Sequence, residues 1–395
     1  MDYLKKTFRW FGPSFGVSLA DIKQLGVDGI VTACHDVPKG EAWSSHKIAQ
    51  LKSVIEKEGL EWSVVESVNI HPAIKYGSPE RDLYIQNYIG TLENLAKHQI
   101  FTICYNFMPL LDWTRTDLHY VLPNGAIGLN FDPLEAVVFD LYIANRAGAG
   151  EYYDRPTKDR AKAHMLTLGI AGLNRLENAI LAGFPGSKES VPLEFLKGNM
   201  EVASKLGKEK LRENLAYFLK AVIPVAENLG IQMALHPDDP PFPVFGIPRI
   251  ASTYEDLKYV LECCPSPNNG LTFCSGSLGA NRENDLPKMI KDFGDRIHFV
   301  HLRNIVVRDD GSFYESTHLQ GSVPMKQVMK ALFHEQRKRL AVGRNDVAIP
   351  LRPDHGHVLL NDKAKENEFY PGYSLIGRAL GLAELSGLEH GVRDF

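Results

Sequence analysis

The sequence predicts an α/β fold in which eight parallel strands close into a (β/α)₈ barrel. Two observations carry this prediction. Short apolar runs rich in β-branched residues recur eight times along the 395 residues, and stretches with helical periodicity separate most of them. Runs that are apolar nearly throughout are typical of strands covered on both faces. Strands that alternate with helices favour a closed barrel over an open sheet.

The predicted strands are bounded by Gly, Pro, Asn or Asp, which commonly end strands. They cover residues 7–12, 28–34, 61–67, 101–107, 231–236, 270–274, 296–302 and 348–354. Between them, apolar residues at intervals of three and four predict helices. These helices cover residues 46–60, 84–98, 211–230 and 253–264. Several end at glycine, a common helix stop.

The stretch from about 108 to 207 departs from this alternation. It contains the turn-like YVLPNG, a polar run, and helical patterns around 159–183 and 192–205. A structureless loop of this length is implausible inside a barrel. We therefore predict a mainly helical insertion after the fourth strand that covers the barrel mouth, within one domain spanning residues 1–395.

Composition excludes several classes of protein. The formal net charge is −4, from 44 basic and 48 acidic residues, with no basic tract of the kind that nucleic-acid binding needs. The first residues lack the apolar core of a signal peptide, and no run is long enough to span a bilayer. The five cysteines are odd in number and match no zinc-finger spacing. A cytoplasmic protein without disulfides is expected.

Four reactive residues each stand at the end of a predicted strand: His236, Cys274, His301 and Asp354. Active sites of such barrels lie at the carboxyl ends of the strands. Each residue alone has an ordinary alternative, as a hydrogen-bonded histidine, a small buried cysteine or a helix-capping aspartate. Four in succession favour a divalent metal site, and the mixed N, S and O donors suit a transition metal rather than Mg²⁺ or Ca²⁺.

Candidate acid–base groups stand close to this set in the sequence. His355 directly follows Asp354, and Tyr373 could bring a phenol to the same mouth. For His357 a solvated loop position is the favoured interpretation, and for Asp238 and Asp239 a supporting role is as plausible as catalysis. Further polar side chains that follow strands are candidates for substrate binding. They are His71, Asn106, Arg303 and Asn304.

The chain also resembles the mannonate dehydratase family nearly from end to end. The motifs that carry the resemblance include TFRWFGPS (7–14), CYNFMPLLDWTRTDLHYVLPNG (104–125), MALHPDDPP (233–241), HFVHLRN (298–304), RPDHGH (352–357) and PGYSLIGRALGLAEL (371–385). HPDDPP and RPDHGH in this order are highly specific, whereas FRWFG alone is weak. A barrel of the xylose-isomerase-like type is implied.

The resemblance implies conversion of D-mannonate to 2-keto-3-deoxy-D-gluconate and water in hexuronate breakdown. It implies Mn²⁺ or Fe²⁺ as cofactor, with ligands on His236, Cys274, His301 and Asp354, and an acid–base pair on His355 and Tyr373. Eliminating water across C2–C3 needs one group to accept the C2 proton and another to protonate the departing hydroxyl. Tyrosine fits the acid role somewhat better, because it becomes a base only when its pKa is lowered.

Three other functions are weighed against this one. A sugar isomerase or epimerase on a similar barrel would more commonly use several carboxylates or a lysine near the metal. A sugar-acid sensor would not need an intact catalytic set, and a nuclease is disfavoured by the charge. A homo-oligomer, provisionally a dimer, is expected from the large insertion.

Overall fold

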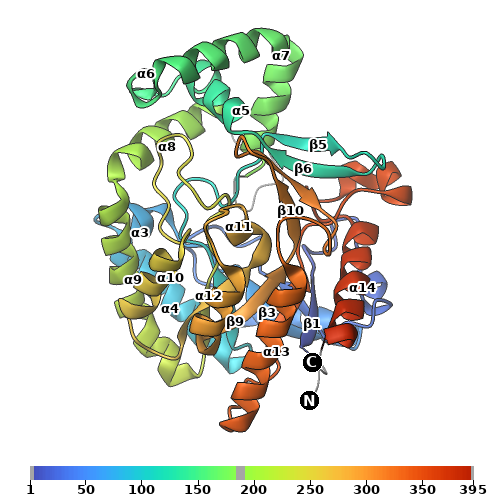
Figure 1. Cartoon of the computed structure of the whole chain (residues 1–395). Coiled ribbons are helices and arrows are strands. Elements are labelled where there is room, and N and C mark those ends of the chain that lie inside the picture. Colours follow the sequence, from blue (N-terminus) through green and yellow to red (C-terminus); the bar gives the residue numbers. More distant parts are fainter. Residues whose placement is uncertain (1–3, 184–191, 393–395) are drawn as a thin grey trace.

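Eight parallel strands close into a barrel in the computed structural model, which describes residues 4–183 and 192–392 (Figure 1). Going around the barrel, the strand order is β1-β12-β9-β8-β7-β4-β3-β2. The strands are β1 (Lys5–Arg9), β2 (Gly29–Thr32), β3 (Glu61–Glu66), β4 (Thr102–Tyr105), β7 (Gln232–Leu235), β8 (Asn269–Cys274), β9 (Ile297–Leu302) and β12 (Pro350–Pro353). Each lies within or overlaps one of the eight predicted runs, so the predicted barrel is confirmed.

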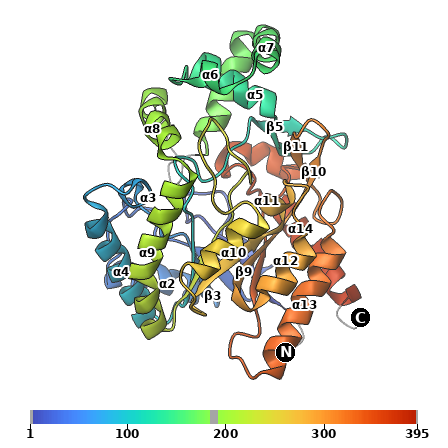
Figure 2. The ribbon, with the colours of Figure 1, turned by 60° about the vertical axis from the view of Figure 1, so that its left-hand side comes forward.

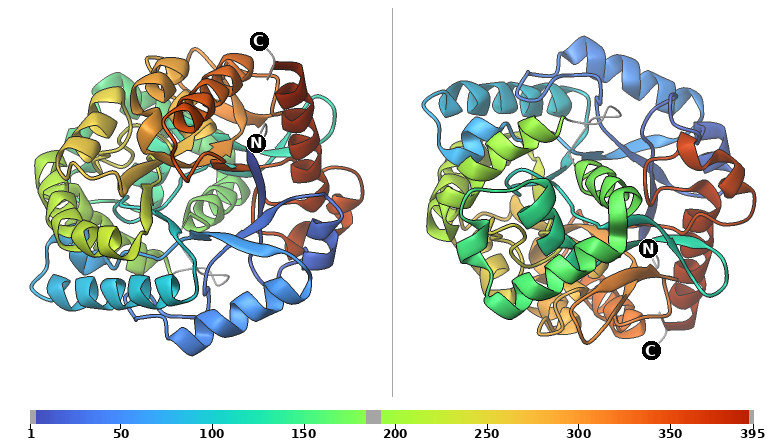
Figure 3. Two further views of the ribbon diagram at one scale, coloured as in Figure 1. Left: turned by 90° about the horizontal axis from the view of Figure 1, so that it is seen from below. Right: turned by 90° about the horizontal axis from the view of Figure 1, so that it is seen from above.

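Helices surround the barrel on the outside, as the views along its axis show (Figure 3). They are α1 (Leu19–Lys23), α2 (Ser45–Lys57), α3 (Pro72–Tyr76), α4 (Arg81–Lys97), α9 (Lys208–Leu229), α10 (Tyr254–Glu262), α11 (Ser275–Gly279), α12 (Leu286–Phe293), α13 (Met325–Ala341) and α14 (Leu375–Val392), with 3₁₀ turns η2 (Gly294–Arg296) and η3 (Leu360–Glu368). Capping side chains and glycines mark where several of these helices begin and end. The Ser44 side chain accepts a hydrogen bond from the Lys47 N–H at the start of α2, and Gly230 ends α9 at a φ of 72°.

Between β4 and β7 the chain forms an insertion above the carboxyl ends of the strands (Figures 1 and 2). Its helices are α5 (Pro133–Val138), the π-helix η1 (Phe139–Ile143), α6 (Ala149–Tyr152), α7 (Arg155–Leu181) and α8 (Leu193–Leu206). Residues 184–191, which the predicted insertion includes, lie outside the described residues. None of the helices in the described part of the chain has the length and apolar composition that a bilayer crossing requires.

A β-hairpin at the start of the insertion was not predicted. Strands β5 (Asp117–Val121) and β6 (Ile127–Phe131) join β10 (Asn304–Val307) and β11 (Phe313–Ser316) in an antiparallel sheet of order β10-β11-β6-β5. Only Arg303 separates β9 from β10, so one stretch of chain leaves the barrel and enters this sheet. The small sheet thus joins the loops that follow β4 and β9, and it lies over the barrel mouth (Figure 1).

The barrel interior below the mouth is apolar. Val31, Val64, Cys104, Ala234 and Phe299 form a buried cluster there, each 1% exposed or less. Close packing of this layer supplies a rigid floor on which strand-end residues can be held.

Candidate metal centre and active-site cavity

A cavity of about 360 Å³ opens at the carboxyl ends of the barrel strands. Aromatic and charged side chains share its wall. The aromatic ones are Phe11, Phe15, Trp113, Tyr370 and Tyr373, and the ionisable ones include Arg9, Asp36, Glu66, Asp112, His236, Asp239, Arg352, Asp354 and His355. Clefts that combine an apolar wall with a few convergent polar groups are typical of small-molecule sites.

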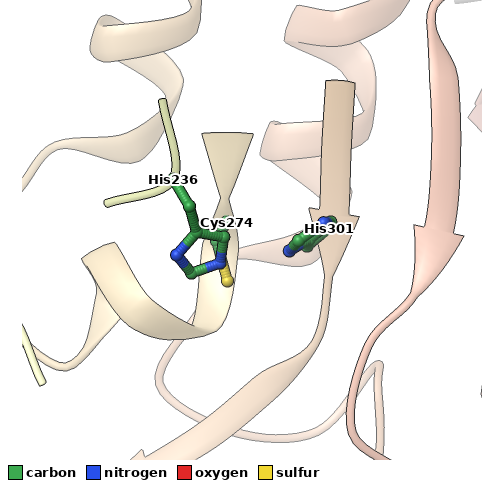
Figure 4. Close-up of side chains that lie close together, drawn as sticks. All are labelled: His236, Cys274 and His301. Carbon is green, nitrogen blue, oxygen red and sulfur yellow. The ribbon is translucent and has the colours of Figure 1, made fainter. Parts of the chain in front are cut away.

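Three predicted metal ligands meet at one edge of this cavity. His236 follows β7, Cys274 ends β8 and His301 lies in β9, and one donor atom from each lies within 4.8 Å of the other two (Figure 4). Cys274 and His301 are fully buried. Three neighbouring strands therefore present two imidazoles and a thiol to one point.

The orientation of both imidazoles fits metal binding. Nδ1 of His236 lies 2.7 Å from the Pro237 carbonyl oxygen, so the ring donates there and leaves Nε2 free as a ligand. Burial lowers the pKa of His236, which keeps the ring neutral. The Nε2 atom of His301 is buried without a hydrogen-bond partner. An unpaired buried nitrogen facing a thiol and a second imidazole is costly unless a ligand such as a metal ion fills the gap.

Asp354 borders this group of three but is also held by other residues. Its Oδ2 lies 3.6 Å from Cys274 Sγ, while Oδ1 accepts from Arg352 at 2.6 Å and from the Tyr373 hydroxyl at 3.2 Å. Burial alone would raise the pKa of the Asp354 carboxyl, but the charges around it, foremost Arg352, hold that pKa well below its usual range. The carboxylate is thus ionised, and its position is set by an arginine.

Glu66 is a charged residue at this centre that the sequence did not single out. It receives two hydrogen bonds from Arg352, at 2.8 and 3.0 Å, and its Oε2 lies 3.5 Å from His301 Nε2. With Cys104 and His301 it forms a second group with metal-ligand spacing. The Cys104 thiol accepts from Thr272, and burial raises its pKa, which disfavours the thiolate that metals prefer.

His355 lines the same cavity, and its Nε2 lies 4.0 Å from Asp354 Oδ1. Its Nδ1 has two close neighbours, Arg303 NH1 at 2.7 Å and Glu315 Oε1 at 3.0 Å. Burial would raise the pKa of Glu315, but Arg303 and His355 outweigh it and lower that pKa to about 2. Nδ1 can accept from the guanidinium or donate to the carboxylate, and this choice decides whether Nε2 carries the proton.

Tyr373 completes this side of the cavity. Its hydroxyl donates to Asp354, and its ring lies edge-on to Phe11 and His355 at centroid distances of 4.8 and 5.2 Å. Burial raises the pKa of the phenol above its usual range, with Arg352 opposing this in part. The hydroxyl therefore stays protonated near neutral pH.

The predicted substrate-binding residues occupy different places. Asn106 lines the cavity directly after β4. Arg303 lies behind the wall and is bonded to Asp239, Ser277 and Glu315 as well as His355.

His71 and Asn304 lie outside the cavity lining. His71 caps α3 by accepting from the Ala73 N–H, and its ring stacks on Tyr84. Asn304 is fully buried, and its side chain bonds to the backbone of Ile305, His318 and Val323. Their position after a strand is better explained by these local contacts, and we do not assign them to the substrate.

Two neighbouring predictions can also be compared with the structure. Asp239 accepts from Arg115 and Arg303, which is the supporting role weighed for it. The interpretation of His357 as a solvated residue is wrong. It is 8% exposed, and its Nε2 lies 3.0 Å from the Glu315 carbonyl oxygen.

Arg9, Glu66 and Arg352 each lie within a predicted strand, and Glu66 and Arg352 lie near its carboxyl end. The same rule that selected the metal ligands could have found these last two. Glu315, Arg115 and Trp113 carried no such signal, since they come from the small sheet and the loop leading to it.

Fold and site together define an enzyme of the (β/α)₈ barrel class, with a candidate metal centre and two candidate acid–base groups, His355 and Tyr373, at one cavity. The family model for D-mannonate dehydratase (UxuA) matches residues 4–395, and the chain belongs to that family of hydro-lyases.

Individual relatives agree with this assignment. The chain is 47% identical over 392 residues to mannonate dehydratase of Chromohalobacter salexigens, covering 99% of both chains. It is 44% identical over 389 residues to that of Saccharophagus degradans, covering 98% of both. A crystal structure of mannonate dehydratase from Streptococcus suis superposes with a TM-score of 0.77 at 34% identity, over 100% of this chain and 95% of that one. A D-allulose 3-epimerase from Methylomonas sp. shares the fold, with a TM-score of 0.50, 12% identity, and coverage of 99% of this chain and 98% of that one.

Proposed function

We propose that this protein dehydrates D-mannonate to 2-keto-3-deoxy-D-gluconate with the help of Mn²⁺ or Fe²⁺. The observation that carries the proposal is the meeting of His236, Cys274 and His301 beside Asp354, in a member of the D-mannonate dehydratase family. His355 and Tyr373 lie next to that carboxylate on the other flank of Asp354. His236, Cys274 and His301 would hold the ion, with Asp354 as the fourth ligand. The nitrogen and sulfur donors support a transition metal. When bound, such an ion supplies Lewis-acid stabilisation of negative charge on the substrate.

The protein groups divide the proton transfers according to their environments. Tyr373 is kept protonated by burial, so it suits the acid that protonates the departing C3 hydroxyl. His355 is then the base that accepts the C2 proton at Nε2. This assignment requires the tautomer whose Nδ1–H donates to the ionised Glu315 carboxylate. Loss of water leaves an enol across C2 and C3, which becomes the 2-keto acid when C3 takes up a proton.

Asn106 lines the cavity and would donate or accept hydrogen bonds with the substrate hydroxyls. Arg303 is proposed to act through His355 and Asp239 rather than on the substrate. The aromatic side chains of Phe11, Trp113 and Tyr370 would limit water around the reacting carbons.

Metal removal tests the proposal directly. Protein treated with a chelator should form no 2-keto acid from D-mannonate and should recover on addition of Mn²⁺ or Fe²⁺. Full activity of the metal-free protein would contradict it. Analysis of the product separates the rival enzyme class, because an isomerase or epimerase would release no water and give no 2-keto-3-deoxy acid.

The proposal extends to the setting of the reaction. A role in hexuronate breakdown predicts that cells lacking the protein fail to grow on glucuronate but grow on glucose. A cytoplasmic location, a homodimer and a single domain over residues 1–395 are further parts of it. Fractionation, light scattering and a single cooperative unfolding transition, respectively, check them.

A further inference from the structure

Arg9 is a buried cation beside the cavity whose hydrogen bonds are incomplete. It is the last residue of β1, is 7% exposed, and contributes to the cavity lining. Its NH1 lies 3.2 Å from Glu66 Oε2, but neither Nε nor NH1 has a hydrogen-bond partner. The ring of Phe11 covers the guanidinium at 4.7 Å from its centroid.

Arg352, the other arginine in the described lining, differs in this respect. Its Nε and NH2 donate to the two oxygens of Glu66, and its NH1 donates to Asp354. Glu66 therefore already has a bidentate cationic partner, and Arg9 is not needed to neutralise it. A guanidinium carries five N–H donors, and burying it with several unpaired costs free energy unless a ligand completes them.

The position of Arg9 indicates which chemical group of a ligand would accept hydrogen bonds from its unpaired N–H donors. Glu66 Oε2 lies 3.2 Å from Arg9 NH1 and 3.5 Å from His301 Nε2, so the guanidinium and the metal-side imidazole are within reach of one small ligand. A planar fork of donors matches a carboxylate, which accepts two parallel hydrogen bonds. Burial beneath Phe11 removes water that would otherwise compete for these donors.

We propose that Arg9 binds the carboxylate of the sugar-acid substrate and thereby selects an acid over an uncharged sugar. This inference rests on the proposed function, since it takes the substrate to be a sugar acid. With the carboxylate fixed at the end of β1, C2 and C3 extend toward His355 and Tyr373, which line the same cavity. Arg9 would be a direct substrate contact that acts mainly through binding.

The test compares an anionic ligand with its uncharged counterpart. Dissociation constants of D-mannonate and D-mannonamide are measured by calorimetry on Mn²⁺-loaded protein carrying Tyr373→Phe, in which turnover is blocked. Adding Arg9→Met should weaken D-mannonate binding on the order of 10- to 100-fold, the range for charge-assisted hydrogen bonds. D-mannonamide binding should change less than about threefold, because it lacks the charge.

Two further measurements guard against a structural effect. Arg282→Met removes an exposed arginine and should leave both dissociation constants unchanged. Mn²⁺ content should stay at the parent level in every variant. If Arg9→Met does not fold, Arg9→Lys keeps the charge without the fork and should weaken D-mannonate by a smaller factor while preserving the preference for the anion.

The inference is overturned if both ligands weaken equally, if neither changes, or if metal is lost with Arg9. Its failure is distinguishable from failure of the proposed function. Protein with all native residues that forms no 2-keto acid from D-mannonate would refute the function, whereas the binding measurements do not depend on turnover.

Discussion

Two neighbouring groups of residues at the cavity, here called the metal side and the acid–base side, are built in different ways. The metal side consists of His236, Cys274 and His301, which stand on or directly after three neighbouring barrel strands. On the acid–base side, His355 depends on Glu315, which comes from β11 of the small sheet. Barrel strands alone place the proposed metal ligands, whereas two loop insertions must meet to hold His355, the proposed base.

Because of this difference, the residues proposed to bind the metal are distinct from the buried charged residues that position His355. Asp239 is bonded by Arg115 and Arg303, and Glu315 by the same two arginines, all of them nearly fully buried. Such a network is stable only when every charge keeps its partner. We therefore expect changes on the metal side to remove the cofactor, and changes in the network to alter catalysis with the cofactor still present.

The largest effect is expected from His301→Ala. Loss of one of three clustered donors should empty the metal site and lower kcat/KM by more than about 1,000-fold, since Lewis-acid stabilisation supplies several kcal/mol. Metal content by elemental analysis and the rate on D-mannonate are the measurements. His298→Gln, three residues earlier in β9, is the matched control and should retain both. Full metal content in His301→Ala would contradict the expectation that changes on the metal side remove the cofactor.

Glu315→Gln should act on the acid–base side. It keeps the shape but removes the charge that favours the Nδ1–H tautomer of His355, so kcat should fall about 10- to 100-fold with KM and metal content little changed. Steady-state kinetics on the metal-loaded protein measure this. Asp309→Asn, a fully exposed residue in the β10–β11 turn, is the control. A loss of metal from Glu315→Gln would show that the two sides are not independent.

Acid stability should reveal a buried neutral histidine in the barrel. Burial is the main cause that lowers the pKa of His298 to about 3, while an unfolded histidine titrates near 6.5. The folded state therefore excludes a proton that the unfolded chain takes up. The stability from this residue is complete above about pH 6.5 and is lost as pH falls toward 3, by at most about 1.4 kcal/mol per pH unit.

Urea unfolding of chelator-treated protein between pH 7 and pH 4 measures this loss. The variant His298→Gln should show a flatter pH dependence than the parent, and the comparison between them cancels the contribution of other groups. Parallel curves would mean that His298 takes up its proton equally in both states.

The smallest effect is expected at a helix start in the insertion. Asp132 caps α5 by accepting from the N–H groups of Leu134 and Glu135, and Asp132→Ala should cost about 1 kcal/mol of stability. Ser44→Ala at the start of α2 is the matching change in the barrel. Activity within about twofold of the parent is expected for both, since neither residue touches the cavity. A larger loss for Asp132→Ala would mean that the insertion shapes the active site through α5.

The barrel could be predicted from the sequence because each of its strands is recognisable from its own consecutive residues. Runs such as GLTFC and RIHFVHL are mostly apolar, and a reactive side chain at the carboxyl end of such a run stands out from its neighbours. The hairpin of β5 and β6 was missed because its short strands are stabilised by pairing with β11, which lies far away in the sequence. For His71 and Asn304 the sequence left the choice open, since a polar residue after a strand can serve a cap or a backbone contact as well as a substrate.

The sequence by itself thus determined the fold class and the family and singled out the residues proposed to bind a metal, because periodicity and strand ends are properties of a few consecutive residues. Only the tertiary structure decided the hydrogen-bond partners and the pKa values of the residues at the cavity. It holds Asp354 by Arg352, places Glu315 and Arg303 in competition for one nitrogen of His355, and leaves Arg9 with unpaired donors. Burial and neighbouring charges set pKa values and hydrogen-bond partners, and both depend on contacts between segments that are distant along the chain.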